Sequence, residues 1–141
     1  MENGLRLVQG PPSLDDYLRL RAESGLTPKT VEQGSAALHG AWSAFHVVAG
    51  AESVGMGRVI GDGGWYFHVV DMAVLPAYQR RGIGDAILTA LLDDIAARAP
   101  AGAYVTLLAD GPGRRLYERH GFAETGPATV GMALRRTTVT P

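Results

Sequence analysis

The stretch Gln79–Asp85, with the sequence QRRGIGD, joins two arginines and two glycines immediately before an amphipathic helical pattern. A helix that begins here presents backbone N–H groups without intrahelical partners, and these groups attract anions together with the helix dipole. Gly82 and Gly84 let a ligand approach the main chain, and Arg80 and Arg81 add positive charge. The turn is therefore predicted to bind phosphate, and a pyrophosphate in preference to a lone carboxylate.

Other interpretations of this turn exist. A surface turn with two solvated arginines would have the same residues, because an isolated Gly-x-Gly pattern is a weak signal. A dinucleotide fingerprint would need a third glycine at the position that Ile87 occupies. A P-loop would need Gly-Lys-Ser/Thr, which the sequence lacks. The elements around the turn must decide between phosphate binding and a plain surface turn.

Composition limits the class of protein. The chain has 141 residues, of which 46% are hydrophobic, and this fits a single globular domain over residues 1–141. Its net charge of -1 gives no field that would favour nucleic acid or an anionic membrane. The absence of cysteine excludes disulfides, thiolate metal sites and a cysteine nucleophile. Without a signal-peptide pattern or a long apolar segment, a soluble, cytoplasmic protein with no membrane partner is expected.

Hydrophobic periodicity and turn residues predict an α/β fold. Strands are expected at residues 5–9, 42–49, 53–60, 65–74, 103–109, 122–125 and 129–135. Helices are expected from Ser13 to about Gly25, from the pair Thr27-Pro28 to about His39, from Gly82 to just before Pro100, and over residues 112–119. Together they form a mixed, mostly antiparallel sheet of about six or seven strands flanked by about four helices, with one βαβ crossover. This order does not fit a Rossmann domain, which alternates strand and helix from its beginning.

The strand before the turn carries two side chains that could accept a proton. The ordinary pKa of a histidine suits His68 to act as a base near neutral pH, although a lone histidine in a strand is more often structural. Strict alternation places His68 and Met72 on one face and Asp71 and Ala73 on the other, so only one of the two titratable groups can face a given reactant. The remaining histidines do not have the spacing of metal ligands, and no metal site is predicted.

Two motifs in this setting resemble a known family. The segment VDMAVLPAYQRRGIG, residues 70–84, resembles the acetyl-CoA-binding signature of the GCN5-related N-acetyltransferases (GNAT), and LLADGPGRRLYERHGF, residues 107–122, resembles the second motif of that family. Their order, spacing and strand-helix setting agree over residues 53–125, while the first two helices match only in position. The resemblance implies a GNAT-like single domain with a splayed acetyl-CoA cleft.

The resemblance also implies which residues bind acetyl-CoA, as a co-substrate. The main chain of Arg80 to Asp85 would hold the pyrophosphate, and the pantetheine arm would pair as a guest strand with the strand before the turn. The N–H of Met72 would face the thioester carbonyl and stabilise the oxygen as charge builds on it. The full set of implied cofactor-binding residues is Met72, Ala73, Val74, Gln79, Arg80, Arg81, Gly82, Ile83, Gly84, Asp85, Asp110 and Tyr117.

Catalytic roles follow from the same family positions. Tyr117 would lie near the CoA sulfur and act as the general acid, and His68 would remove the proton of the amine, directly or through water. Asp110 departs from the asparagine more usual in the second motif, so it keeps an acceptor but loses the amide donor and gains charge. No covalent enzyme intermediate is needed, which agrees with the missing cysteine.

The implied function is acetyl-CoA-dependent N-acetylation of a primary amine of a small molecule or peptide, and the resemblance also allows a homodimer. The acceptor would lie between the first helices and the last strands, where acidic residues would favour a cationic amine. No motif ranks the candidates for its lining, which are Tyr17, Arg21, Glu23, Glu32, Trp42 and Phe67.

Two alternatives from other classes stay open at this point. A non-catalytic acyl-CoA-binding module or sensor could keep the same phosphate turn. A nucleic-acid-binding domain could use Arg80, Arg81, Arg114 and Arg115, but the near-zero net charge and the absence of interleaved aromatic residues argue against it.

Overall fold

The structure of the chain is a computed structural model, and it describes residues 1–136. Contacts divide the chain into two compact units, Met1–Leu107 and Leu108–Pro141, which are described separately below. The single domain over residues 1–141 stays a prediction.

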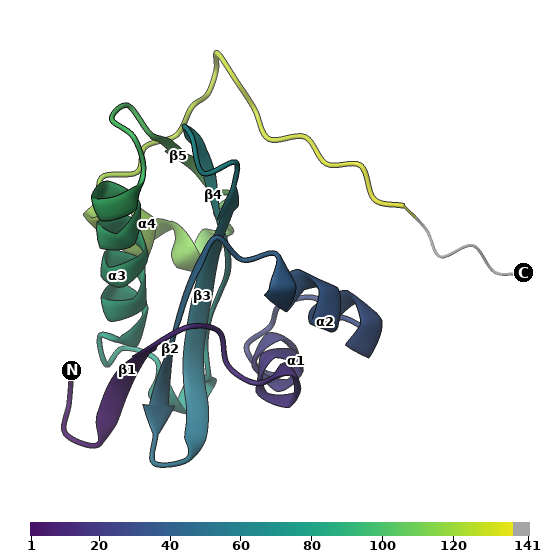
Figure 1. The fold of residues 1–141 in the computed structure, drawn as a ribbon, viewed down its shortest axis with the longest axis vertical. Coiled ribbons are helices and arrows are strands. Elements are labelled where there is room, and N and C mark those ends of the chain that lie inside the picture. Colours follow the sequence, from purple (N-terminus) through teal and green to yellow (C-terminus); the bar gives the residue numbers. More distant parts are fainter. Residues whose placement is uncertain (137–141) are drawn as a thin grey trace, which may run out of the picture. The chain divides into compact units, whose positions relative to one another are not determined.

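A five-stranded mixed sheet forms the centre of the first unit (Figure 1). The strands are β1 (Leu5–Gln9), β2 (Ser43–Ala49), β3 (Glu52–Gly61), β4 (Tyr66–Val74) and β5 (Tyr104–Thr106), and they lie side by side in chain order. The first four strands form an antiparallel meander, whereas β4 and β5 are parallel. The predicted meander and the parallel crossover are both confirmed, and β5 is shorter than the predicted strand over residues 103–109.

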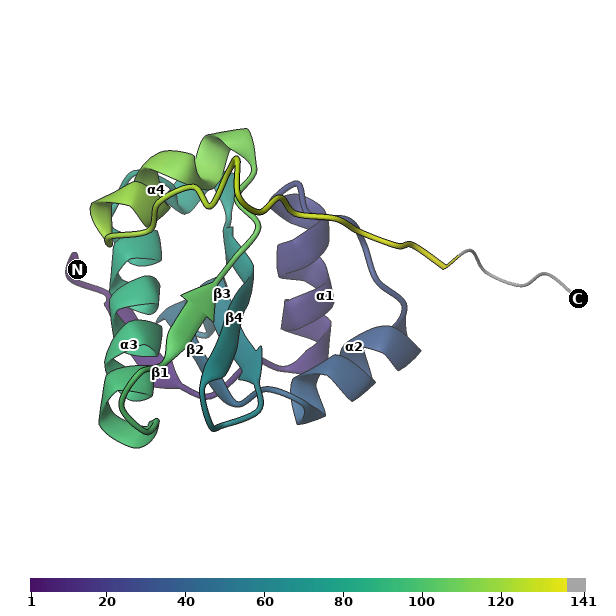
Figure 2. The same cartoon turned by 90° about the horizontal axis from the view of Figure 1, so that it is seen from above.

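Helices cover both faces of this sheet. Figure 2 shows α3 (Ile83–Arg98) on one face, and α1 (Leu14–Glu23) and α2 (Val31–His39) on the other. The apolar side chains that α3 turns toward the sheet are almost completely buried: Ile83, Ile87, Leu88, Leu91 and Ile95. Burial of each such side chain stabilises the fold by about 1.5–3 kcal/mol relative to exposure, so the packing of α3 on the sheet contributes strongly to the core.

Close packing of α3 on the sheet depends on a glycine in β3. A Cβ atom added to Gly57 would collide with the sulfur of Met72 and would lie 2.9 Å from Ile87 and 3.2 Å from Leu91. The bare backbone of Gly57 therefore makes room for the Met72 side chain between the sheet and α3.

Helix caps explain where α1 and α2 begin. Ser13 caps α1 as predicted, since its hydroxyl accepts from the N–H of Asp16 at 3.2 Å. The predicted start of the second helix at Thr27-Pro28 was wrong. A capping box formed by Thr30 and Gln33 sets the start at Val31, because each side chain bonds the backbone of the other residue.

A β-bulge interrupts the pairing of β3 with β4. Met56 pairs with Ala73 and Arg58 pairs with Val70, so the two residues Asp71 and Met72 stand opposite the single residue Gly57. Asp71 adopts φ 60°, a left-handed conformation that aspartate tolerates better than most residues. The bulge shifts the alternation of side chains along β4 by one residue.

The second unit contains short helical elements. A 3₁₀ turn, η2 (Gly111–Gly113), leads into α4 (Arg114–Arg119), and Gly121 follows with φ 91°. The predicted helix over residues 112–119 is therefore confirmed in its position, as one 3₁₀ turn and a short α-helix.

The strands predicted at residues 122–125 and 129–135 were wrong, because residues 122–136 form no strand in the described part of the chain. Alternation of apolar residues makes a strand only where another backbone completes the ladder. Here Thr129 bonds back to the carbonyl of Thr125 at 3.2 Å in a local turn. Val130, Met132 and Leu134 are 70%, 89% and 85% exposed, so this alternation has no apolar surface to cover within the unit.

No helix among residues 1–136 is both long and apolar enough to cross a membrane.

Candidate functional site

The turn before α3 has an unusual main-chain conformation. After the 3₁₀ turn η1 (Pro76–Tyr78), Arg80 has φ 64° and Gly82 has φ 79°, so two residues of this short turn are left-handed. Left-handed residues in such turns aim successive N–H groups into one concavity, which favours anions. A Cβ atom at Gly82 would meet nothing within 4 Å, so the main chain there is open to approach. Gly82 is also the N-cap of α3 and contributes no capping side chain.

Two of the side chains at the turn, Arg80 and Arg81, are exposed. Arg81 lies 3.8 Å from the carboxylate of Glu2 and packs over the ring of Tyr78 at 5.1 Å. Gln79 donates its side-chain amide to the carbonyl of Val74 at 3.1 Å, which ties the turn to the end of β4. Arg80 and Arg81 are both exposed, and their charges are available to a phosphate ligand.

Only the first three residues of β4 pair with β5, which ends at Thr106. The parallel pairing joins Tyr66 to Tyr104, Phe67 to Val105 and His68 to Thr106, and it ends there. On that edge of β4, residues 69–74 have no strand partner within residues 1–136. A backbone edge of this kind can accept an extended, amide-containing ligand as an additional strand.

His68 is the last residue of β4 that pairs with β5. Its Nδ1 is 2.8 Å from the hydroxyl of Thr106, and that hydroxyl donates to the carbonyl of Phe67 at 3.3 Å. A threonine hydroxyl has only one proton, so we assign the proton of the His68–Thr106 bond to Nδ1. This tautomer leaves the lone pair of Nε2 available. Partial burial lowers the pKa of His68, which keeps the ring neutral and able to accept a proton.

Asp71 is the centre of a buried cluster of side chains from three elements. Its carboxylate lies 2.5 Å from Nη1 of Arg21 in α1 and 2.5 Å from Nε of Arg58 in β3. The hydroxyl of Tyr17 in α1 donates to the same carboxylate at 2.7 Å. Burial and the neighbouring Asp71 carboxylate raise the pKa of Tyr17, so this phenol stays protonated as a donor. Two guanidinium groups thus share one carboxylate, whose side chain is 7% exposed.

The bulge places His68 and Asp71 on the same face of β4, and the prediction of opposite faces was wrong. Val70 pairs with Arg58, and His68 pairs with Ile60, two residues further along β3. The Arg58 side chain bonds the Ala37 carbonyl of α2, so His68 and Val70 lie on the face toward α1 and α2. Asp71 bonds α1 on that face, whereas the Met72 side chain lies beside α3 on the other. Strict alternation failed because the extra residue of the bulge reverses the faces after Val70. Three donors hold Asp71, so of these two titratable groups His68 is the better candidate for a base.

The family follows from comparison with known proteins. The sequence model of the acetyltransferase (GNAT) domain matches residues 41–124, more than half of the chain. The chain belongs to the GNAT acetyltransferase family. No curated protein matches it at a significant level.

Solved structures agree with GNAT membership. A probable acetyltransferase of unknown function from meticillin-resistant Staphylococcus aureus is 36% identical, with a TM-score of 0.89 over 94% of this chain and 99% of the other. A GNAT-family acetyltransferase from Streptococcus pneumoniae is 26% identical, with a TM-score of 0.76 over 94% and 98% of the two chains. The ribosomal-protein-S18-alanine N-acetyltransferase of Escherichia coli shares the fold, at 19% identity and a TM-score of 0.72 over 86% and 79% of the chains.

Membership in the GNAT family implies acetyl-CoA as the donor, and the residues of the first unit fit this co-substrate. The open, left-handed main chain around Gly82 suits a diphosphate, and the unpaired edge of β4 suits an amide-bearing arm. Within residues 1–136, no group of three or more His, Cys, Asp or Glu side chains could hold a metal ion.

Tyr117 and Asp110 of this GNAT chain lie in the second unit. Asp110 caps η2, since its side chain accepts from the N–H of Gly113 at 3.3 Å. The ring of Tyr117 in α4 is edge-on to Phe122, with centroids 6.1 Å apart. Burial, and secondly the charge of Asp110, raise the pKa of Tyr117, so its phenol carries a proton at neutral pH. The contact of either residue with acetyl-CoA stays a prediction.

The predicted acceptor-lining residues divide into three groups. Tyr17 and Arg21 belong to the Asp71 cluster. Trp42 and the fully buried Phe67 pack against each other with centroids 4.8 Å apart, and Trp42 is covered by Arg98 of α3, so this pair lies on the face opposite α1 and α2. Glu23 and Glu32 are exposed.

Sequence reasoning missed Thr106 and Arg58 altogether. No local pattern indicates that Thr106 contacts His68, because the pairing of β4 with β5 brings them together across 38 positions. The role of Arg58 depends equally on the pairing of β3 with β4. A possible signal was the buried aspartate in an apolar strand, since a buried carboxylate requires cationic or hydrogen-bonding partners.

Proposed function

We propose that this chain transfers an acetyl group from acetyl-CoA directly to a primary amine of a small molecule or peptide. The observation that carries the proposal is the early end of the β4–β5 pairing at His68 and Thr106, which leaves the rest of the β4 edge open beside a basic imidazole. The left-handed turn at Arg80 and Gly82 supports it, because it provides an anion site at the end of the same strand.

In this proposal, Nε2 of His68 takes a proton from the ammonium form of the acceptor, directly or through water, which leaves a neutral amine. The amine nitrogen then attacks the thioester carbon and the new C–N bond forms; the nitrogen loses its second proton to water as the C–S bond breaks. The N–H of Met72 donates to the carbonyl oxygen as negative charge develops there. Tyr117 gives its proton to the departing CoA sulfur, and both side chains exchange protons with solvent before the next turnover. Each acid-base group should contribute about 10²–10⁴-fold to the rate.

The main chain of Arg80 to Asp85 would hold the pyrophosphate, with Gln79 at the entry to the turn. Met72, Ala73 and Val74 would pair with the pantetheine arm through their backbone. Val74 already accepts a bond from Gln79 on its carbonyl. When the pantetheine arm binds, the Gln79 amide would therefore either give up its bond to the Val74 carbonyl or share that carbonyl with the arm.

Release of free CoA with a panel of primary amines tests the proposal. We expect release that depends on both acetyl-CoA and amine, and that falls at least about 100-fold in Tyr117→Phe and in His68→Gln. Saturable binding of acetyl-CoA without amine-dependent release would instead identify a non-catalytic acyl-CoA-binding module. Absence of acetyl-CoA binding would contradict both functions.

A further inference from the structure

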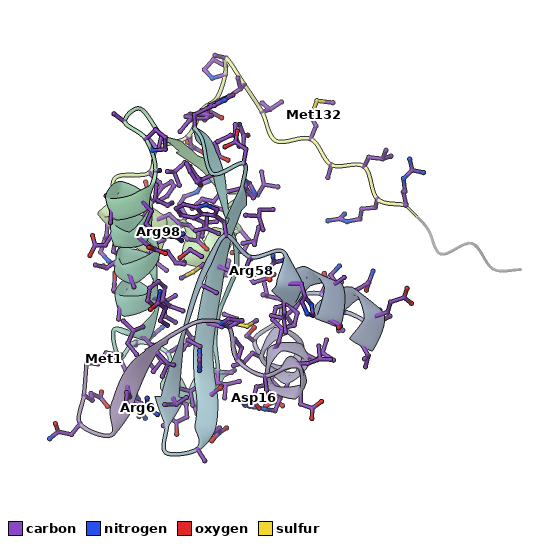
Figure 3. All side chains as sticks on the ribbon, viewed as in Figure 1. Met1, Arg6, Asp16, Arg58, Arg98 and Met132 are labelled. Atoms are coloured by element: carbon purple, nitrogen blue, oxygen red, sulfur yellow. The ribbon has the colours of Figure 1, made fainter. Side chains whose placement is uncertain are left out.

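The Asp71 cluster carries an excess of positive charge that a purely structural ion pair would not need. Arg21 and Arg58 bring two guanidinium charges to one carboxylate, and the Tyr17 hydroxyl is neutral. The side chains of Arg21 and Arg58 are 11% and 14% exposed, so solvent compensates the additional positive charge only weakly. Figure 3 shows Arg58 on the face of the sheet toward α1 and α2, opposite Arg98 on α3.

Both guanidinium groups keep donors that the protein does not use. Arg21 donates from Nε to the Thr27 carbonyl at 2.9 Å and from Nη1 to Asp71, and Arg58 donates from Nε to Asp71 and from Nη1 to the Ala37 carbonyl at 3.4 Å. Within residues 1–136, neither Nη2 group has an acceptor. No buried side-chain nitrogen or oxygen there lacks a partner, so the two Nη2 groups must reach solvent.

The cluster lies on the same face of β4 as His68 and close to it along the strand. Arg58 pairs with Val70, and His68 pairs with Ile60, so the two side chains are two residues apart along adjacent strands. At about 3.3 Å per residue, this corresponds to a separation of roughly 7 Å along the strand direction. An acceptor of comparable length could place its amine at His68 and its other end at the guanidinium groups.

We propose that Arg21 and Arg58 select an acceptor amine that carries a carboxylate or phosphate group roughly 5–8 Å from its nitrogen. The anionic group would accept from the free Nη2 donors and neutralise the additional charge, a geometry that guanidinium groups suit. This inference rests on the proposed function. It reverses the sequence-based expectation of a cationic amine, because Glu23 and Glu32, which motivated that expectation, are exposed and Arg21 is buried.

Matched acceptors test this preference in the whole protein. We expect kcat/KM for γ-aminobutyrate to exceed that for n-butylamine, which has the same chain without a carboxylate, by about 10–100-fold. Arg58→Gln should abolish the preference through a higher KM for γ-aminobutyrate, and the ratio of the kcat/KM values for the two amines measures this loss independently of the overall rate of the variant. Arg19→Gln is the control, since Arg19 lies on the same helix and bonds Asp16 and Ser53 instead of Asp71. Equal kcat/KM values for the two wild-type reactions, or an unchanged preference in Arg58→Gln, would overturn the inference.

A binding measurement separates this inference from the proposed function and does not depend on the folding of a variant. In ¹⁵N spectra of the wild-type protein, γ-aminobutyrate should shift the Nε–Hε signals of Arg21 and Arg58 with saturation, and n-butylamine should not. Shifts of this kind without any acetylation would support the anion site and contradict the enzyme. Acetylation of both amines without these shifts would support the enzyme and overturn the anion site.

Discussion

The two sides of β4 are built by different means. On the side of the turn before α3, the main chain forms the proposed anion site through left-handed residues and an unpaired strand edge. On the side of α1 and α2, side chains from distant segments meet at Asp71 and His68, as in the bond between Tyr17 and Asp71 over 54 positions. A backbone site is encoded in one short segment, whereas a side-chain site requires the complete fold. The predictions below challenge this contrast, in order of expected effect.

Removal of the Asp71 charge should cause the largest loss of stability. Asp71→Asn leaves two buried guanidinium groups without their carboxylate, so we expect the free energy of unfolding to fall by about 3–5 kcal/mol in urea titrations. Asp94→Asn is the matched control, because its cationic partner Arg98 is 49% exposed and the Ser43 hydroxyl, which also donates to Asp94, can donate to an asparagine oxygen, so the change should cost about 1 kcal/mol or less. Equal losses in the two variants would remove the special role of the Asp71 cluster.

Loss of His68 should reduce turnover more than it reduces stability. His68→Gln keeps a polar side chain but no basic nitrogen, so kcat should fall by about 10²–10⁴-fold with the KM for acetyl-CoA nearly unchanged. Steady-state kinetics with a primary amine measures both constants. A fall of less than about tenfold would mean that another group or water accepts the proton.

The lowered pKa of His68 also predicts the sign of a pH effect. Because burial disfavours the charged ring, the unfolded chain binds this proton more readily than the folded protein. The free energy of unfolding should therefore fall as the pH drops through the ordinary histidine range near 6.5, and His68→Gln should weaken this dependence. An identical pH dependence in both proteins would contradict the assigned burial effect.

The turn before α3 should affect binding of the co-substrate specifically. Gly82→Val places a β-branched residue in a left-handed conformation, with a strain of about 1–3 kcal/mol, and the dissociation constant for acetyl-CoA should rise about tenfold or more. Gly102→Val is the control, since Gly102 has φ 89° and open space in the loop before β5. It should lose comparable stability and keep its affinity in calorimetry. Weaker binding in both variants would point to a global effect of strain.

The smallest expected effect tests the orientation of His68. Thr106→Val removes the hydroxyl that fixes Nδ1 as the protonated nitrogen, and kcat should fall by about 2–10-fold. Thr106→Ser keeps the hydroxyl and should restore most of the rate. The ¹⁵N shifts of the imidazole report the tautomer directly, and an unchanged tautomer in Thr106→Val would refute the assignment.

The same contrast explains how much the sequence could predict. The meander, the crossover helix and the glycine-containing turn before it are signalled locally, by alternation and by the glycines of residues 79–85. The bulge at Asp71 and Met72 could not be predicted, because it is a property of the pairing of β3 with β4 and it reverses the faces on which the assignment of the base depended. Thr106 and Arg58 are functional candidates only once that pairing is known. Residues 129–135 show the opposite failure, since their alternation is real but lacks a strand partner within the described part of the chain.

A crystal structure of the protein with acetyl-CoA tests the central claim most directly. The diphosphate oxygens should lie within hydrogen-bond distance of main-chain nitrogens in residues 80–85, and the pantetheine amides should pair with the free edge of β4 between Met72 and Val74. Acetyl-CoA bound elsewhere on the molecule, or no heat of binding at millimolar concentration, would contradict the account.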